Sequence, residues 1–241
     1  FDTTLHVNAT NDHLVAFLDY EEVTKSVTPE EPATSKKVEG EMIPPPPREE
    51  LDSELPLNKF KPNNLVFLVD VSTSMKHRGK LELMKVAMVE LINDLREIDR
   101  FTLISYASDA GVLVKTENNL DKEACKRAIA ELTAGGKTEG AKALNRAGRA
   151  ALDFYIENGN NQIILATDGA FNEGSEKAKR LSSKYRRKGV LTSVVGIKCG
   201  KFTTEEMSEL AEKGGGSFVA LDSVDQADDI LLKEVKLRSS K

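Results

Sequence analysis

The chain has 241 residues, 39% of them hydrophobic, and a formal net charge of -5, which suits one large domain or one domain with an appendage. The acidic balance argues against broad electrostatic binding to nucleic acid or anionic lipid, and no apolar run approaches the roughly 20 residues of a membrane-spanning helix. Cys125 and Cys199 are too few for a disulfide framework and match no metal or redox motif. Two unpaired, mostly buried thiols are therefore expected.

Residues 1–28 are predicted to form a small β segment, because apolar side chains alternate loosely along the chain at Leu5, Val7, Leu14, Ala16 and Leu18. The stretches around Leu5 and from His13 to Tyr20 resemble the closing strands of a carboxypeptidase regulatory-like β-sandwich, a module found on exported and outer-membrane proteins. Only the tail of such a module would be present. The resemblance favours a location in the periplasm, at the outer membrane or on the surface of a bacterial cell.

Residues 29–62 are predicted to be a linker. Pro44 to Pro47 form a proline block within Glu-rich sequence, and no apolar period runs through the segment. This composition is typical of an extended, polyproline-like tether that adds nothing to a hydrophobic core. We therefore expect the domain that follows, residues 63–235, to fold without the linker.

From residue 63 onward, apolar strands alternate with amphipathic helices. The predicted strands cover residues 65–70, 101–107, 111–116, 162–168, 190–197 and 217–222, and the predicted helices cover about 80–97, 121–132, 139–157, 174–188, 203–213 and the end of the domain from 223. The connection between 101–107 and 111–116 is short enough for a hairpin, so the second of these strands is predicted to be antiparallel. The pattern indicates an α/β fold: a doubly wound, Rossmann-like open sheet, mostly parallel with one antiparallel edge strand and with helices on both faces.

Side-chain patterns also predict which helix faces are buried and where two of the helices begin. The first helix places Leu81, Met84, Met88, Leu91 and Leu95 on one face, and the closing helix has a stripe of Val224, Ala227, Ile230, Leu231 and Val235. Thr203 with Glu206, and Ser223 with Gln226, have the spacing of a capping box. Two helices are therefore expected to begin at Thr203 and Ser223.

Three loops bring oxygen-bearing side chains to the places where strands are expected to end. They are Asp70-Val71-Ser72-Thr73-Ser74, Gly135-Gly136-Lys137-Thr138-Glu139-Gly140 and Thr167-Asp168-Gly169. In open parallel sheets, ligands bind outside the carboxyl ends of the strands, at the switch point of the strand order. No His or Cys joins these loops, and an oxygen-only donor set suits Mg²⁺, Mn²⁺ or Ca²⁺ rather than Zn²⁺ or copper. The sequence therefore predicts a site for a hard divalent cation.

The same loops resemble the metal-ion-dependent adhesion site (MIDAS) of the von Willebrand factor type A (VWA) domain. The resemblance rests on Asp-x-Ser-x-Ser after a buried strand, a Gly-Gly-x-Thr loop and a Thr-Asp-Gly turn, and it covers about residues 60–235. The stretches NNLVFLVDVSTSM and GNNQIILATDGAFNEG resemble in particular the bacterial secreted YfbK-like group. The resemblance implies that Ser72, Ser74 and Thr138 are hydroxyl ligands of the ion. It also implies that Asp70 and Asp168 hold the ion directly or through water.

What the resemblance implies about function is binding rather than catalysis. A partner protein would present an Asp or Glu carboxylate to the open coordination position of Mg²⁺, with Mn²⁺ or Ca²⁺ as alternatives. Thr73, Lys137 and Glu139 would form the partner-binding rim, where Thr73 and Lys137 replace the smaller residues common in relatives. We expect an adhesion-like module of the cell envelope, alone or within a larger complex, with no nucleic-acid partner and no membrane span.

Three alternatives compete with this hypothesis. Gly136-Lys137-Thr138 matches the end of a phosphate-binding loop, but Glu131 stands where that motif needs its first glycine, and a helix precedes the loop instead of a strand. A metal-assisted hydrolase needs a general base beside the ion, and Glu139 is the one loop acid that is not expected to hold the ion. A structural domain with an unused metal site is the third alternative.

Overall fold

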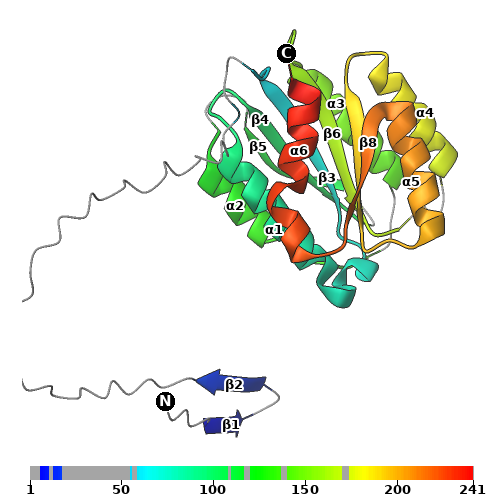
Figure 1. Cartoon of the computed structure of the whole chain (residues 1–241). Coiled ribbons are helices and arrows are strands. Elements are labelled where there is room, and N and C mark those ends of the chain that lie inside the picture. The colour runs from blue at the N-terminus through cyan, green and yellow to red at the C-terminus, as the bar shows by residue number, and fades with distance from the viewer. Residues whose placement is uncertain are drawn as a thin grey trace, which may run out of the picture. The chain divides into compact units, whose positions relative to one another are not determined.

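The computed structural model describes residues 6–10, 13–17, 55, 59–107, 110–116, 120–136, 140–169 and 174–240. The chain divides into two compact units, Phe1–Arg48 and Glu49–Lys241 (Figure 1). In the first unit, strand β1 (His6–Thr10) pairs antiparallel with β2 (His13–Phe17), so that Thr10 faces His13. The two short strands predicted from the alternation are present. Most of the predicted linker lies outside the described residues.

The second unit is built on a six-stranded sheet with the order β5-β4-β3-β6-β7-β8. Its strands are β3 (Asn63–Asp70), β4 (Arg100–Tyr106), β5 (Ala110–Thr116), β6 (Asn160–Thr167), β7 (Leu191–Ile197) and β8 (Gly215–Leu221). Strand β5 is antiparallel to β4 at one edge, and the other strand pairs are parallel. The predicted fold class, including its antiparallel edge strand, is confirmed.

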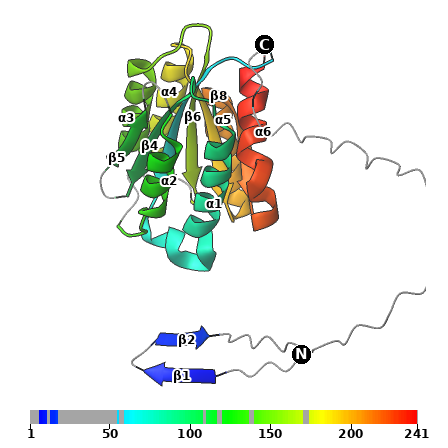
Figure 2. The ribbon, with the colours of Figure 1, turned by 90° about the vertical axis from the view of Figure 1, so that its left-hand side faces the viewer.

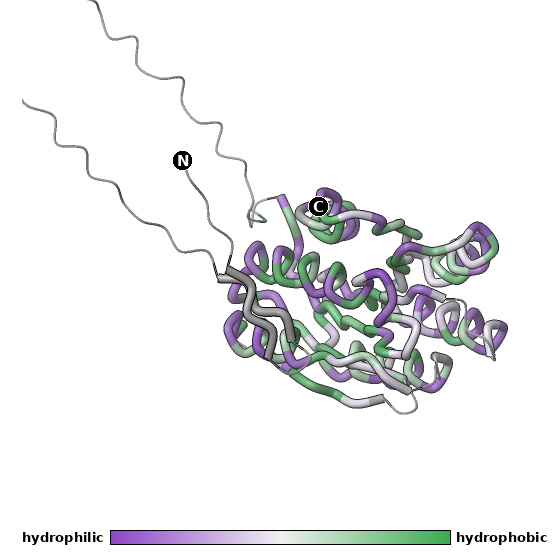
Figure 3. The backbone as a smooth tube through the Cα atoms, turned by 90° about the horizontal axis from the view of Figure 1, so that it is seen from below, coloured by the Kyte–Doolittle hydropathy of each residue, from purple (hydrophilic) through white to green (hydrophobic). Residues whose placement is uncertain are grey.

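Helices cover both faces of this sheet (Figures 1 and 2). One face carries α1 (Lys80–Asp94), α2 (Lys122–Ala130) and α6 (Ala227–Ser239), and the other carries α3 (Gly140–Asp153), α4 (Ser175–Arg186) and α5 (Lys201–Gly214). Successive strand residues alternate between the two layers: Phe67 packs in the first core and Leu68 in the second. Hydrophobic residues fill the central strands, while hydrophilic residues lie on the outer sides of the helices (Figure 3).

The predicted apolar face of α1 is confirmed, because all five of its residues are buried. Three features of the later helices were predicted wrongly. Helix α5 begins at Lys201 after an extended Gly200, so Thr203 lies inside the helix and does not cap it. The closing helix begins at Ala227 after a short 3₁₀ turn, η2 (Val224–Gln226), and the Ser223 side chain forms no capping bond. Val224 is 59% exposed and is not part of the buried stripe.

The end of the predicted linker packs on the domain. Leu55 is buried in the core on the side of the sheet that carries α1, α2 and α6, and Phe60 pairs with Ser240 in an isolated antiparallel bridge. Arg96 donates hydrogen bonds to the carbonyl oxygens of Leu55, Phe60 and Lys61. The boundary drawn at residue 63 is therefore corrected toward the N-terminus, because a buried leucine and a satisfied guanidinium both depend on residues before it. Among the described helices, none combines the length and the apolar composition that crossing a bilayer requires.

Candidate metal-binding site

The site lies at the switch point of the sheet. From β3 the chain moves outward to β4 and β5 on one side, and β6, β7 and β8 fill the other side. Strands β3 and β6 are therefore parallel neighbours, and their register places Val69 opposite Ala166 at their carboxyl ends. Asp70 and Thr167 follow those two residues, and Asp168 comes directly after β6. This is the position at which open α/β sheets bind ligands.

Asp70 is held rigidly at the end of β3. Asp70 is only 1% exposed. One carboxylate oxygen, Oδ1, accepts a hydrogen bond from the backbone N–H of Ser72 at 2.8 Å, and Oδ2 accepts one from Thr167 Oγ1 at 2.8 Å. Burial raises the pKa of Asp70 above its ordinary value, although the bonds from Ser72 and Thr167 favour the charged form. A buried carboxylate is thus kept at the rim at a cost in desolvation.

Three further oxygen atoms form a chain across the rim. Ser72 Oγ lies 3.0 Å from Ser74 Oγ, and Ser74 Oγ donates to Asp168 Oδ1 at 2.8 Å. An octahedral Mg²⁺ with ligands at about 2.0–2.1 Å holds neighbouring ligand oxygens about 2.9 Å apart. The three oxygens already have this spacing without rearrangement. The residues present therefore fit a small divalent cation with oxygen ligands.

Lys80 is a component of the site that sequence reasoning missed. Its ammonium group lies 2.6 Å from Asp168 Oδ2, and the two side chains are only 14% and 3% exposed. Both oxygens of Asp168 are therefore engaged, one by Ser74 and one by Lys80. The lysine balances one of the two carboxylate charges at the rim. Its position at the start of α1 gave no signal, because 88 residues separate it from its partner.

The Gly-Gly loop is brought against the serine loop by backbone hydrogen bonds. The N–H of Gly135 donates to Val71 O at 2.6 Å, and both the N–H and the Oγ1 of Thr73 donate to Gly136 O at 3.2 Å. Thr73 thus joins two of the three loops. Lys137, Thr138 and Glu139, predicted respectively as rim residue, ligand and rim residue, lie outside the described residues.

Among the residues of the rim that the structure describes, the remaining polar groups do not form a nucleophilic centre. Burial raises the pKa of the Cys199 thiol to about 11, and the nearby Asp168 raises it further in the same direction. The thiol donates weakly to Thr167 O at 3.7 Å and stays protonated near neutral pH. Burial also holds the pKa of Tyr106, which pairs in register with Asp70, well above its usual range. Cys125 and Cys199 are unpaired, as predicted.

Within the described ranges there is no group of three or more His, Cys, Asp or Glu side chains that could hold a metal. A zinc site built from imidazole and thiolate ligands would contain such a group. Here the donors that converge are two carboxylates and two hydroxyls, from Asp70, Asp168, Ser72 and Ser74. Of the five ligands predicted from the sequence, the structure brings together these four.

Comparison with known proteins agrees with the fold. The profile of the von Willebrand factor type A domain matches residues 64–233. YfbK of Escherichia coli is 33% identical over 177 residues, which cover 72% of this chain and 31% of YfbK. The chain thus corresponds to about a third of that relative's length.

Solved structures share the fold at low sequence identity. BatB from Bacteroides thetaiotaomicron has a TM-score of 0.62 and 21% identity, over 73% of this chain and 98% of its own. A manganese-loaded TRAP protein from Plasmodium vivax has a TM-score of 0.59 and 19% identity, over 75% of each chain. Proximal thread matrix protein 1 of the mussel byssus, with a zinc-occupied MIDAS motif, has a TM-score of 0.56 and 23% identity, over 76% of this chain and 48% of its own. The strand order, the profile match over most of the chain and the identity to YfbK agree, and the chain belongs to the von Willebrand factor type A domain family.

Proposed function

We propose that the protein is a metal-ion-dependent binding module that captures an acidic side chain of a partner protein. The ion would be held by Asp70, Ser72, Ser74, Thr138 and Asp168, with Mg²⁺ as the first candidate and Mn²⁺ or Ca²⁺ as alternatives. VWA domains are in general protein-interaction modules, and two relatives of the same fold hold zinc or manganese. Because those relatives hold different ions, the native ion is a matter for measurement.

The observation that carries the proposal is the pre-arranged chain of oxygens from Ser72 through Ser74 to Asp168. Hydroxyl oxygens are neutral, so they complete a coordination shell without neutralising a cation. Lys80 offsets the charge of Asp168, which leaves Asp70 as the one uncompensated carboxylate among the described residues of the site. A divalent cation bound there would keep positive charge, and an incoming carboxylate is the ligand that such a hard cation prefers.

Catalysis is the weaker candidate. A metal-bound water needs a neighbouring base whose pKa lies near the working pH. Among the described residues near the rim, Cys199 and Tyr106 have pKa values shifted upward, so both stay protonated at neutral pH and do not act as that base. The rim is therefore better suited to holding an anion than to activating water.

We place the protein at the bacterial cell envelope, in the periplasm, at the outer membrane or on the surface. The N-terminal hairpin β1–β2 fits the tail of a carboxypeptidase regulatory-like module, and a solved structure of related fold is described as an aerotolerance-related membrane protein from Bacteroides fragilis. In this proposal residues 1–28 form the β segment, and a Pro/Glu-rich tether joins it to the VWA domain.

Two linked measurements test the proposal. Isothermal titration with Mg²⁺, Mn²⁺ and Ca²⁺ should detect one site in the wild type and none in the Ser72→Ala/Ser74→Ala variant, while Ser183→Ala, on α4, binds as the wild type does. Affinity capture from the native envelope should then yield a partner in Mg²⁺ that is lost in EDTA and with Asp70→Ala. Equal capture in all three conditions would exclude this rim as the binding surface.

A further inference from the structure

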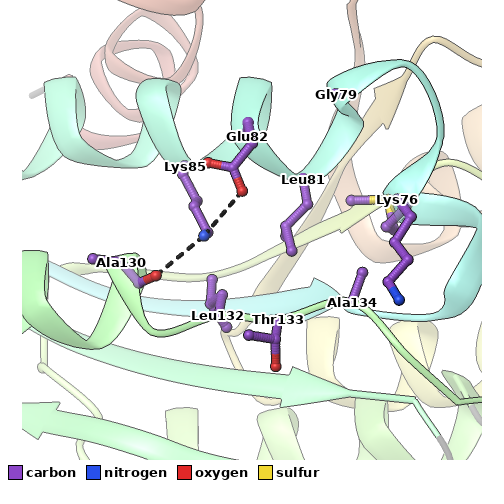
Figure 4. A pocket seen from close by; sticks show the side chains of 10 residues that line it. Lys76, Gly79, Leu81, Glu82, Lys85, Ala130, Leu132, Thr133 and Ala134 are labelled. Carbon is purple, nitrogen blue, oxygen red and sulfur yellow. Dashed lines mark hydrogen bonds and ion pairs between the residues drawn. The ribbon is translucent and has the colours of Figure 1, made fainter. Parts of the chain in front are cut away.

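A groove of about 500 Å³ opens beside the candidate metal site (Figure 4). It lies between α1 with the preceding 3₁₀ segment, η1 (Thr73–Gly79), on one side and the end of α2 with the following loop on the other. Its apolar lining comes from three buried side chains: Met75, Leu81 and Leu132. Ala130, Thr133 and Ala134 form the opposite wall with small side chains, so the groove stays open. Its volume falls in the range of about 300–1,000 Å³ that is typical of ligand pockets.

The groove shares its walls with the loops of the metal site. Met75 directly follows Ser74, and Ala134 directly precedes Gly135, whose N–H is bonded to Val71 O. Consecutive Cα atoms are about 3.8 Å apart, so the groove begins within about one residue of each loop. A ligand that reached the metal rim with a carboxylate would therefore have its neighbouring residues over the groove.

The charges around the groove favour an acidic ligand. Segment η1 carries Lys76, His77 and Arg78 and no acidic residue. Inside the groove, Lys85 donates to Ala130 O at 3.1 Å and pairs with Glu82 at 3.0 Å, which balances the one carboxylate of the lining (Figure 4). Lys76 lines the groove, is exposed, and forms no ion pair within the described ranges. The η1 side of the groove, next to the metal-site serines in the chain, is thus positive, while the exposed Glu131 stands on the α2 side, between the lining residues Ala130 and Leu132.

We infer that this groove is the specificity pocket of the metal site: it takes an apolar side chain of an acidic peptide segment whose Asp or Glu is bound at the rim. The inference rests on the proposed function, because the same segment would supply both groups. An extended peptide advances about 3.3 Å per residue, so the apolar side chain would stand within about three positions of the acid. Further acidic residues of the segment would face Lys76 and Arg78.

A selection from random displayed peptides tests the inference with the full chain. Peptides bound in Mg²⁺ and released by EDTA should be enriched in Asp or Glu with Leu, Ile, Met or Phe within about three positions. Ala130→Trp and Thr133→Trp fill the groove from exposed positions and should weaken such a peptide by about tenfold or more, as expected for losing the burial of one apolar anchor. Asn93→Trp adds the same ring at an exposed site at the far end of α1 and should leave binding unchanged.

The outcomes separate this inference from the function on which it rests. The pocket inference would be wrong, and the metal function would stand, in either of two cases. The selected metal-dependent peptides could show no preference for an apolar residue, or both groove-filling variants could bind the peptide with unchanged affinity. Binding that persists in EDTA, or selected peptides without an acid, would overturn both. Mg²⁺ titration of Ala130→Trp and Thr133→Trp should match the wild type, because neither residue is a proposed ligand. A lost metal site in these variants would contradict the separation of pocket and rim.

Discussion

Lys80 determines how much negative charge the rim offers to a cation. Its ammonium group lies 2.6 Å from Asp168 and is largely shielded from water, so its charge is weakly screened. Removing it would leave Asp168 as an unbalanced buried carboxylate, which costs folding stability, but it would also remove a repulsion that any bound cation experiences. Metal-free stability and metal affinity should therefore change in opposite directions.

We predict that Lys80→Met unfolds at lower temperature than the wild type in EDTA and binds Mg²⁺ about tenfold more tightly. Tenfold corresponds to about 1.4 kcal/mol, which is a fraction of the Coulomb energy between two unit charges a few Å apart near a protein surface. The measurement is the rise in melting temperature between EDTA and millimolar Mg²⁺, which should be larger for Lys80→Met than for the wild type. Lys80→Arg keeps the charge and serves as the control. A smaller rise in Lys80→Met would mean that the lysine supports the site and does not oppose the ion.

Asp70 provides a second prediction at this scale. Because burial raises its pKa, the folded metal-free domain binds a proton there more tightly than the unfolded chain does. The charged form therefore lowers stability at neutral pH, and this penalty is relieved as the pH falls through the raised pKa. Asp70→Asn should raise the melting temperature in EDTA at pH 7, with a smaller gain near pH 4, and should gain nothing from Mg²⁺. If the variant melted lower than the wild type at pH 7, the hydrogen bonds from Ser72 and Thr167 would outweigh desolvation.

The residues that the sequence predicted at the rim are those with a recognisable spacing. Asp70, Ser72 and Ser74 follow a buried strand, and Asp168 follows another, so the topology alone brings them together. Lys80 was not predicted as part of the site, and Thr167, although it belongs to the predicted Thr-Asp-Gly loop, was given no role, because these roles depend on pairs separated by 88 and 97 residues in the chain. Local pattern contains no information about such partners.

At the scale of elements, strand cores were predictable and strand starts were not. Strands β3 and β6 begin two residues earlier than predicted, at Asn63 and Asn160. These polar residues are buried because they bond to each other: Asn160 Nδ2 donates to Asn63 Oδ1, and Asn64 Nδ2 donates to Asn161 Oδ1. A pattern based on hydrophobicity places such residues outside the sheet, since the acceptors for their amide N–H groups come from a neighbouring strand.

The packing of α3 on α4 predicts that replacing a helical glycine by alanine lowers stability, which is opposite to the usual effect. A Cβ added to Gly148 would lie 2.2 Å from the ring of Tyr185, whose hydroxyl is bonded to Asn145. Replacing a helical glycine by alanine normally gains about 0.5–1 kcal/mol. Gly148→Ala should instead lower the free energy of unfolding by about 1–3 kcal/mol through overpacking.

Urea unfolding measures this effect, and the double variant Gly148→Ala/Tyr185→Leu provides the control. Removing the ring should recover part of the loss relative to Tyr185→Leu alone. A stabilised Gly148→Ala variant would mean that α3 and α4 separate easily.

At the scale of the whole molecule, the VWA unit depends on residues before its first strand. Leu55 is buried, and Arg96 uses carbonyl groups at Leu55, Phe60 and Lys61. A chain that starts at residue 63 should therefore be less stable than one that starts at 49 by about 2–4 kcal/mol, the scale of one lost leucine with unsatisfied guanidinium donors. Leu55→Ala in the full chain should reproduce most of the loss. Equal unfolding midpoints for the two truncated chains would mean that the residues before 63 do not stabilise the domain, and the boundary at 63 would stand.

Proline composition predicted a tether, and the fold was predicted from the alternation of strands and helices. The sequence could not show where the tether ends, because Leu55 is a single apolar residue without a period around it. We expect limited proteolysis to cut within residues 29–54 and to leave a fragment that retains Leu55.

The central claim is that one divalent cation binds at the carboxyl ends of β3 and β6. Anomalous diffraction from crystals of the protein grown with Mn²⁺ tests it most directly, because the signal locates the ion without reference to function. The account predicts one strong peak in contact with Ser72 Oγ and Ser74 Oγ, between Asp70 and Asp168, and its absence in Ser72→Ala/Ser74→Ala crystals. No peak in the wild type, or a peak only elsewhere on the molecule, would contradict the claim.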